Sequence, residues 1–280
     1  MEHPGAAGNA AGRANCRADG SASAHPAVVV AVPARLASSR LPGKVMADIG
    51  GRPMLQHVLE RCRRARGVAA VFACTDSEEV LEAALSWGFE GLLTPESCSS
   101  GSERLAAVTG ELVAAGGASP RDTLVINVQG DQPLLDPAII EAMVERFARL
   151  RRPPVLTPVY RLVPDKIHDP NVVKVLRAAD GRAITFSRSA LPHVRDLPPE
   201  QWHRRASYWG HVGLYGYRGD VLAGWHDLSP SALEDQEKLE QLRLIEAGIP
   251  IGTFEVPDDC FSVDTPQQLE QARALVRATS

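Results

Sequence analysis

The sequence predicts an α/β fold with a mixed, mainly parallel sheet and a smaller antiparallel insertion, and three observations lead to it. A valine-rich run at residues 28–32 has the composition of a strand buried on both faces. After it, β-branched runs alternate with amphipathic helical patterns to about residue 155, as in parallel sheets with crossover helices. Beyond that point, prolines interrupt several strand-like runs, so we expect the insertion there.

The first strand leads into a basic loop. Pro33 ends the strand because it lacks the N–H that a ladder needs, and the loop continues to Lys44. Residues 50–52, Gly-Gly-Arg, form a turn, and Pro53 is expected at the first position of a helix. The apolar positions of that helix, from residue 54 to 65, lie on one face. This is a first strand–helix unit.

The alternation continues along the next hundred residues. A strand at 68–74 precedes a helix that is capped by Asp76 or Ser77 and runs to about residue 87. A short strand at 89–93, a turn at 99–104, a helix to about residue 115 and a strand at 123–128 follow. Asp136 and Pro137 then open another helix as N-cap and first-turn proline. The pattern indicates one continuous parallel core.

The second half is less regular. We expect strands at 155–160, 171–176, 183–188 and 212–217, forming an antiparallel insertion that leaves the main sheet. A single helix is predicted from Leu233 to about Ala247, where Gly248 ends it. A strand at 250–256 and a last helix after Pro266 return the chain to the core.

Composition excludes several classes of protein. A formal net charge of -4 argues against a nucleic-acid binder, which would carry a basic domain. No run approaches the roughly 18 apolar residues of a membrane span. Arg13 and Arg17 before the apolar run 27–34 imitate a secretory signal, but the run is short and contains Pro33. Five scattered cysteines without a C-x-x-C pair fit reduced thiols in a cytoplasmic protein.

The basic loop is the first candidate site. Arg35, Arg40 and Lys44 are the charges expected of a triphosphate cradle, because guanidinium groups bind phosphate oxygens in pairs and lysine adds a point charge. Ligands of open α/β sheets bind at the carboxyl ends of strands, where this loop starts. The sequence Leu-Pro-Gly-Lys that ends at Lys44 lacks the G-x-x-x-x-G-K-[ST] spacing of the ATPase P-loop. The alternative is an ordinary solvated loop.

Two aspartates form the second candidate. Asp131 directly follows a buried strand, and Asp264 follows the apolar residues 261–263. If both lie at the same edge of the sheet, they could hold Mg²⁺, which binds one or two carboxylates together with substrate phosphates. The alternative is that each only caps a turn or helix, and Asp264 before Thr265-Pro266 has the sequence of an N-cap.

Two further groups have no assigned chemistry from the residues alone. Glu234, Glu237 and Glu240 are three residues apart on the predicted helix, a spacing usual for a solvated face. The insertion contains Arg188, Tyr208, His211 and Tyr215, and a lone histidine there is more often structural than catalytic.

Nine motifs in unbroken order resemble a known family. They are P-A-R-x-x-S-x-R-L-P-G-K (33–44), Thr-Asp at 75–76, S-G-S-E-R-L (100–105), N-V-Q-G-D-x-P (127–133), P-N-V-V-K-V (170–175), F-S-R (186–188), H-V-G-L-Y-G-Y (211–217), L-E-Q-L-R (239–243) and V-D-T-P (263–266). Together the motifs resemble 3-deoxy-manno-octulosonate (KDO) cytidylyltransferases. The basic loop is shared with CMP-sialic acid synthetases, whereas L-E-Q-L-R, H-x-G-x-Y and V-D-T-P point to the KDO branch.

The resemblance implies a Rossmann-like nucleotidyltransferase that makes CMP-KDO and pyrophosphate from CTP and KDO, for lipopolysaccharide synthesis. It implies Mg²⁺ as cofactor, a cytoplasmic location, a homodimer, and no nucleic-acid or membrane partner. The implied divisions are a nucleotide-binding core at 27–160, a sugar-binding and dimerisation insertion at 161–230, and a return to the core at 231–280. Residues 1–26 have no counterpart in the resemblance, and their Ala- and Gly-rich composition without apolar periodicity predicts a disordered extension.

The resemblance also implies roles for single residues. Lys44, Arg35, Asp131 and Asp264 are the expected catalytic groups, with Asp131 and Asp264 on Mg²⁺. Residues expected at the nucleotide are Ala34, Arg35, Arg40, Lys44, Ser102, Arg104 and Gln129. Residues expected at the sugar acid are Gln129, Arg188, His211, Tyr215, Glu240 and Gln241. Arg188 is the natural partner for the sugar carboxylate.

Two departures leave alternatives open. Gln132 stands where the family usually has Glu, which removes a negative charge beside the expected metal, and Ala232 replaces a usual proline. The acceptor could be a related acid, such as a sialic acid or an amino-KDO. A non-enzymatic alternative is a CTP-binding regulator that has lost its activity, which would follow if Gln132 weakened the expected metal site.

Overall fold

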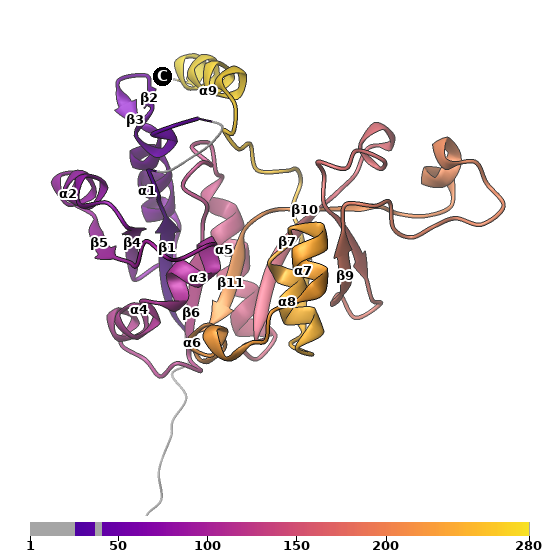
Figure 1. Ribbon diagram of the computed structural model, residues 1–280, viewed down its shortest axis with the longest axis horizontal. Coiled ribbons are helices and arrows are strands. Elements are labelled where there is room, and N and C mark those ends of the chain that lie inside the picture. Colours follow the sequence, from indigo (N-terminus) through magenta and orange to yellow (C-terminus); the bar gives the residue numbers. More distant parts are fainter. Residues whose placement is uncertain (1–25, 37–40, 280) are drawn as a thin grey trace, which may run out of the picture.

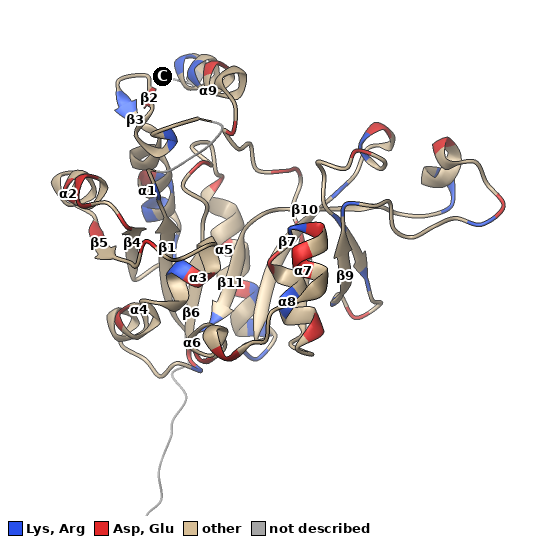
Figure 2. Cartoon of the chain, viewed as in Figure 1, with Lys and Arg blue, Asp and Glu red and all other residues tan. Residues whose placement is uncertain are grey.

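The computed structural model describes residues 26–36 and 41–279. Arg40, Cys16 and almost all of the expected extension at 1–26 lie outside these ranges. Among the described residues, every helix is too short or too polar to span a bilayer. Basic and acidic residues are interspersed along the helices and the insertion (Figure 2).

One mixed sheet of ten strands organises the chain, as the sequence predicts (Figure 1). The strands follow the order β5-β4-β1-β6-β11-β7-β10-β8-β9, and β12 pairs with β7. The bounds of the strands in this sheet are β1 Ala27–Pro33, β4 Ala70–Thr75, β5 Glu90–Leu93, β6 Thr123–Asn127, β7 Val155–Arg161, β8 Lys174–Arg177, β9 Ala183–Ser187, β10 Trp209–His211, β11 Tyr215–Arg218 and β12 Ile251–Glu255.

Helices cover both faces of this sheet. Their bounds are α1 Met54–Arg64, α2 Glu78–Ser86, α3 Gly101–Ala106, α4 Thr109–Gly116, α5 Pro137–Arg149, α6 Gly219–Ala223, α7 Ala232–Glu237, α8 Gln241–Glu246 and α9 Pro266–Thr279. Val28, Val30 and Val32 of β1 pack in one core with α1 and α5. Val29 and Ala31 pack in a second core with α3, α4 and α8. The valine-rich run is therefore buried on both sides, which is why it does not alternate with polar residues.

The parallel half agrees closely with the sequence. β5, β4, β1 and β6 are mutually parallel. Ser77, one of the two expected caps, caps α2 by accepting a hydrogen bond from Val80 N, and Asp136 caps α5 through Ala138 N. The helix after the basic loop begins at Met54 rather than Pro53, because Pro53 belongs to a small hairpin of β2 (Asp48–Ile49) and β3 (Arg52–Pro53).

The turn of that hairpin contains Gly50 and Gly51, both at positive φ. Two central residues with positive φ are typical of a type I′ turn, which suits the twist of a two-residue hairpin. α9 packs against this hairpin through Ile49 and Leu269. The C-terminal segment is thereby anchored beside the loop that carries Lys44.

The prediction that the insertion leaves the main sheet is wrong. β8, β9 and β10 are antiparallel, as expected, but β10 pairs with β7 and continues the sheet. The strand predicted at 212–217 corresponds to β11, which begins only at Tyr215, and the sequence did not predict the short strand β10 that precedes it along the same neighbour. β10 pairs with residues 159–161 of β7 and β11 with residues 155–156.

The long helix predicted from Leu233 to Ala247 is broken. α7 ends at Glu237, Lys238 has a left-handed φ of 55°, and α8 starts only at Gln241. The helix predicted up to residue 115 is likewise divided into α3 and α4. The break at Lys238 has a functional consequence, since it places Leu239 and Glu240 between two helices rather than on the face of one.

Candidate active site

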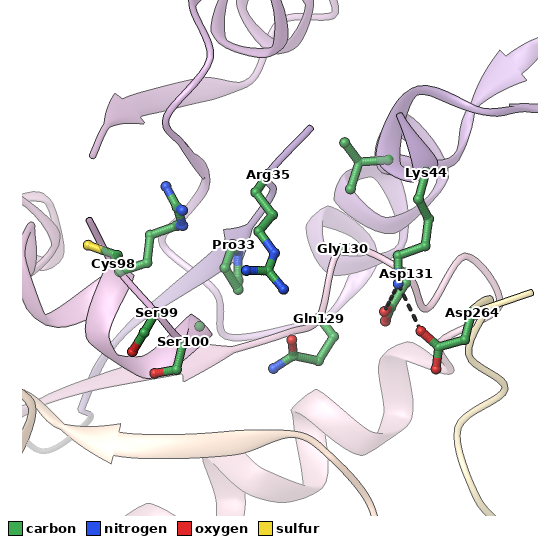
Figure 3. Close-up of a pocket in the computed structure, with 13 residues that line it drawn as sticks. Pro33, Arg35, Lys44, Cys98, Ser99, Ser100, Gln129, Gly130, Asp131 and Asp264 are labelled. Atoms are coloured by element: carbon green, nitrogen blue, oxygen red, sulfur yellow. Dashed lines mark hydrogen bonds and ion pairs between the residues drawn. The ribbon is translucent and has the colours of Figure 1, made fainter. Parts of the chain in front are cut away.

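A polar cavity of about 250 Å³ lies where the chain leaves β1 and β6 (Figure 3). We call it the Lys44 pocket. Its walls are Pro33, Arg35, Lys44, Val45, Cys98, Ser99, Ser100, Gly101, Arg104, Gln129, Gly130, Asp131 and Asp264. Parallel strands end here, so the cavity has the position expected of a ligand site in an open α/β sheet.

Lys44 joins the two candidate aspartates. Its Nζ lies 2.6 Å from Asp131 Oδ2 and 3.0 Å from Asp264 Oδ1 (Figure 3). Burial acts to lower the pKa of Lys44, but the two carboxylates outweigh that effect and the pKa is raised. The ammonium therefore stays charged, and two acidic side chains from distant parts of the sequence converge on one cation.

The alternative that Asp264 serves as a helix cap is wrong. Thr265 Oγ1 accepts a hydrogen bond from Gln268 N, and Gln268 Oε1 accepts from the backbone N–H groups of Asp264 and Thr265. This reciprocal pair satisfies the start of α9, as in a capping box. The Asp264 carboxylate is turned towards Lys44 instead. Val263 N also donates to Asp131 O at 2.9 Å, which ties the two aspartate segments together.

The donor set at this point fits Mg²⁺. The two carboxylates already share a cation, the Lys44 ammonium. Within the described part of the chain, no group of three or more His, Cys, Asp or Glu side chains is placed to hold a metal ion. A pair of carboxylates completed by substrate phosphate oxygens is a usual Mg²⁺ environment. Asp131 and Asp264 are thus the residues that could hold the ion.

The arginines of the pocket differ in burial. Arg35 is exposed and extends into the cavity, close to Gln129 (Figure 3). Arg104 is almost completely buried, its Nη2 2.7 Å from Asp76 Oδ2 and its Nη1 hydrogen-bonded to the Thr94 hydroxyl. Arg104 is therefore a fixed positive charge in the wall, whereas Arg35 can adjust to a ligand.

Gly130 explains how the two loops fit together. A Cβ at this position would lie 2.9 Å from the carbonyl oxygen of Pro33, closer than side-chain carbons approach backbone atoms. Only glycine allows the loop after β6 to pack directly on the loop after β1. Asp131 is brought next to Lys44 by this contact.

A second, larger cavity of about 880 Å³ adjoins the first. We call it the Glu240 pocket. Its walls are Ser99, Ser100, Gly101, Gln129, His211, Gly213, Tyr215, Pro230, Ser231, Glu234, Asp235, Lys238, Leu239, Glu240, Gln241 and Arg243. The two pockets share Gln129 and residues 99–101. A ligand in one pocket can therefore reach a ligand in the other past Gln129.

Glu240 is the most unusual group of the second pocket. Its Oε1 accepts a hydrogen bond from Ser102 Oγ at 3.0 Å, while its Oε2 is buried without a hydrogen-bond partner among the described residues. Burial raises the pKa of Glu240, opposed by hydrogen bonds from Ser100 and Ser102. The three glutamates do not form the solvated face expected of them, because Glu234 binds Arg243 and Glu237 binds Ser187.

The aromatic groups of this pocket are neutral. Burial lowers the pKa of His211 to about 3 and raises that of Tyr215 well above its usual range. Thr157 Oγ1 donates to Leu214 O at 2.8 Å and lies 3.0 Å from His211 Nε2. The hydroxyl has one proton; with that proton directed to Leu214 O, Nε2 is assigned as the donor to Thr157 and Nδ1 is left as an acceptor.

The structure separates the predicted site residues into three groups. Arg35, Lys44, Arg104, Asp131 and Asp264 line the first pocket, and Gln129 lines both. His211, Tyr215, Glu240 and Gln241 line the second. The described lining residues do not include Ala34, Ser102 or Arg188.

These last three residues have structural contacts instead. Ala34 N donates to Cys74 O, and Ser102 Oγ pairs with Tyr217 OH at 2.8 Å as well as with Glu240. The Arg188 guanidinium binds two backbone carbonyls, Glu237 O at 2.8 Å and Pro170 O at 3.1 Å. Ser102 thus sits between the pockets as a buried support.

Sequence reasoning missed several residues that shape the site. Cys98 lines the first pocket but had no motif, and Thr94 and Thr157 had no signal beyond their strand propensity. Asp76 was considered only as a possible helix cap, and it proves to be the partner of Arg104. The cysteines within the described ranges are all buried free thiols, in line with the expectation of reduced cysteines.

Comparison with known proteins decides the family. The model of a family described as cytidylyltransferase matches residues 29–251. The chain is 41% identical over 254 residues to the 3-deoxy-manno-octulosonate cytidylyltransferase of Myxococcus xanthus, covering 89% of this chain and 96% of that protein. The chain belongs to the 3-deoxy-manno-octulosonate cytidylyltransferase family. The resemblance inferred from the nine motifs is thus confirmed.

Other members of the KDO cytidylyltransferase family and its structural neighbours agree. The Escherichia coli protein is 39% identical over 248 residues, covering 89% of this chain and 95% of its own. A solved CMP:2-keto-3-deoxy-manno-octonic acid synthetase complexed with CTP has a TM-score of 0.82 and 38% identity, covering 90% and 99% of the two chains. A cytidylyltransferase from Leptospira borgpetersenii, at 16% identity and a TM-score of 0.59, shares the fold.

Proposed function

We propose that this chain transfers CMP from CTP to the anomeric hydroxyl of KDO and releases pyrophosphate. The observation that carries the proposal is the pair of adjoining pockets in a member of this family. One pocket has cations and two carboxylates for a metal–triphosphate. The other combines uncharged hydrogen-bonding groups, such as His211 and Tyr215, with charged side chains, such as Arg243, for a sugar acid. Gln129 lies in the wall of both pockets, where the two substrates would meet.

The first pocket supplies the electrostatics of phosphoryl transfer. Arg35 and Lys44 would bind the triphosphate, and Arg104 would provide a fixed positive charge beside it. Asp131 and Asp264 would hold Mg²⁺ against the phosphates. When bound, the ion would polarise the α-phosphate and favour ionisation of the sugar hydroxyl. Positive groups that are already in place stabilise the charge that develops on the phosphates without first having to reorganise.

The second pocket would position the acceptor. His211 remains neutral and can accept a hydrogen bond from a sugar hydroxyl at Nδ1, while Glu240 Oε2 offers an acceptor that has no hydrogen-bond partner among the described residues. Holding the hydroxyl in line with the α-phosphate turns an encounter of two substrates into a local reaction, which is a large part of the rate enhancement in such enzymes. We expect Arg188 to meet the sugar carboxylate through Nη1, in exchange for its contact with Pro170 O, while Nε keeps its contact with Glu237 O.

A pyrophosphate-release assay tests the proposal. The enzyme is incubated with CTP, Mg²⁺ and, separately, KDO, an amino-KDO and a sialic acid, with an EDTA control for the metal. We expect pyrophosphate with KDO and little without Mg²⁺. Release with another acid alone would reassign the acceptor, and CTP binding without release from any acid would indicate the regulator alternative.

We also propose a homodimer, a cytoplasmic location and a role in lipopolysaccharide synthesis. The support for the dimer is the insertion, where β9 ends the sheet order and Val163 and Ile184 are large exposed apolar residues. An edge strand with exposed apolar side chains is commonly covered by a partner. Sedimentation analysis of the full chain checks this, and a monomer at micromolar concentration would contradict it.

A further inference from the structure

Lys174 is a completely buried lysine at the start of β8. Its Nζ donates to the carbonyl oxygens of Asp169 at 2.8 Å and Val172 at 2.6 Å, and to that of Arg188. A protonated lysine has three N–H donors, and three carbonyls accept them. Burial lowers the pKa of Lys174, and the nearby charges of Asp169 and Glu237 oppose that effect.

One side of Lys174 supports the wall around His211. The loop that it holds continues into residues 171–173, which line a third cavity of about 290 Å³ together with Asp131 and His211. Val173 O accepts a hydrogen bond from His211 N at 2.9 Å, and Gly210 pairs with Lys174 in the sheet. A shift of this loop would therefore move His211.

The other side of Lys174 supports the wall around Glu240. Arg188, whose carbonyl it binds, donates from its backbone N to Glu237 Oε2 at 2.9 Å and from Nε to Glu237 O at 2.8 Å. Glu237 is the last residue of α7, directly before the left-handed Lys238 and the segment that contains Glu240. The contacts thus run from Lys174 through Arg188 to the break between α7 and α8.

We propose that Lys174 is a positioning residue for the sugar acid, because its ammonium joins the two walls that contain His211 and Glu240. The proposal rests on the proposed function and deepens it. It also gives a role to P-N-V-V-K-V, a motif without assigned chemistry. The walls of the Lys44 pocket include none of the residues in this series, neither Lys174 nor Arg188 nor Glu237, so we expect the effect on the nucleotide site to be small.

The variant Lys174→Met tests the proposal, since it keeps an unbranched side chain and removes all three hydrogen bonds that the ammonium donates. We expect the KM for KDO to rise about tenfold or more, because small displacements of a bound substrate have large effects. The KM and Kd for CTP should equal those of the wild type. The matched control is Lys166→Met, which removes an exposed lysine of the same insertion, 3.4 Å from Asp169 Oδ2.

A second variant covers the case in which Lys174→Met does not fold. Glu237→Gln weakens the next contact in the series, and we expect the same selective rise in the KM for KDO. In the double variant the rise in the KM for KDO should be smaller than the product of the two single-variant factors, since both substitutions act through Arg188. An unchanged KM for KDO in both single variants, or an equal loss for CTP and KDO, would overturn the proposal.

Failure of the proposed function has a different signature. If the wild-type enzyme releases no pyrophosphate with KDO, that function is wrong whatever the variants do. The role of Lys174 is then tested by hydrogen exchange, in which Lys174→Met, or Glu237→Gln if the former does not fold, should increase exchange at residues 187–189 and 237–241. Unchanged exchange in those segments would contradict the inference.

Discussion

The Lys44 pocket and the Glu240 pocket share a wall but differ in the groups at their centres. The first works with charges, and the cation of Lys44 is paired with two carboxylates that remain partly accessible. The second combines the neutral groups His211 and Tyr215 with Glu240, whose pKa is raised by burial, and with the ion pair of Glu234 and Arg243. A triphosphate needs counter-charges, whereas the hydroxyls of a sugar need oriented donors and acceptors. Each pocket therefore matches one substrate.

The largest effect should come from the charged pocket. Asp264→Asn removes one of the two carboxylates for the metal, and we expect kcat to fall about a thousandfold or more, since a carboxylate at this position helps gather charge in the transition state. CTP binding, measured by calorimetry, should remain detectable. Asp258→Asn, at an exposed position of the same segment, is the control and should keep full activity. Full activity of Asp264→Asn would remove this residue from the site.

A smaller effect is expected in the Glu240 pocket. Glu240→Ala removes an acceptor and leaves Ser102 without its carboxylate partner, at a cost of about 1–3 kcal/mol or tenfold to a hundredfold in kcat/KM for KDO. The Kd for CTP should not change, which separates the two pockets. Glu200→Gln, on the surface of the insertion, serves as the control. A parallel loss of CTP affinity would show that the pockets are not independent.

The buried histidine predicts a pH dependence of stability. The pKa of His211 is about 3 in the folded chain and about 6.5 when unfolded, so the unfolded state gains a proton that the folded state refuses. Stability should therefore fall as the pH drops from 6.5 towards 3, by at most about 2 kcal/mol at pH 5. Urea unfolding of the wild type and His211→Gln at pH 7 and pH 5 measures this. An equal loss in both proteins would contradict the assignment.

The smallest effect is expected at Cys98 in the charged pocket. Burial raises the pKa of its thiol, so it is a poor nucleophile at neutral pH. We expect Cys98→Ser to change kcat/KM for CTP by no more than about twofold, which corresponds to about 0.5 kcal/mol. Steady-state rates at saturating KDO with varied CTP provide the measurement. A strong loss would mean that packing of the thiol, and not charge alone, shapes this pocket.

The same contrast explains what the sequence could predict. Arg35, Lys44 and Asp131 follow buried strands of the parallel half, and the ends of such strands meet at one edge of the sheet. Their proximity was therefore readable from local patterns. The role of Asp264 could not be decided from the sequence alone, which is compatible with a helix cap as well as with a metal ligand. The structure shows that Thr265 and Gln268 form the cap.

The Glu240 pocket depends on tertiary contacts that cannot be recognised in the local sequence. Nothing in residues 232–247 marks a break, as no glycine or proline interrupts the run of helix-forming residues. The break at Lys238 accompanies contacts made from the insertion, since Arg188 Nε binds Glu237 O. In the same way, only the pairing of β10 with β7 reveals that the insertion belongs to the sheet. Tertiary contacts outweigh helix propensity and strand pattern at both places.

Strand β7 has a consequence for how the molecule unfolds. Its first residues pair with β11 and its last with β10, while β12 pairs along residues 155–159. The insertion and the core therefore share strand β7, and separating them would break hydrogen bonds on which both depend. We expect a single cooperative transition in calorimetry rather than two. The acceptor side of the enzyme should accordingly keep its structure for as long as the nucleotide side does.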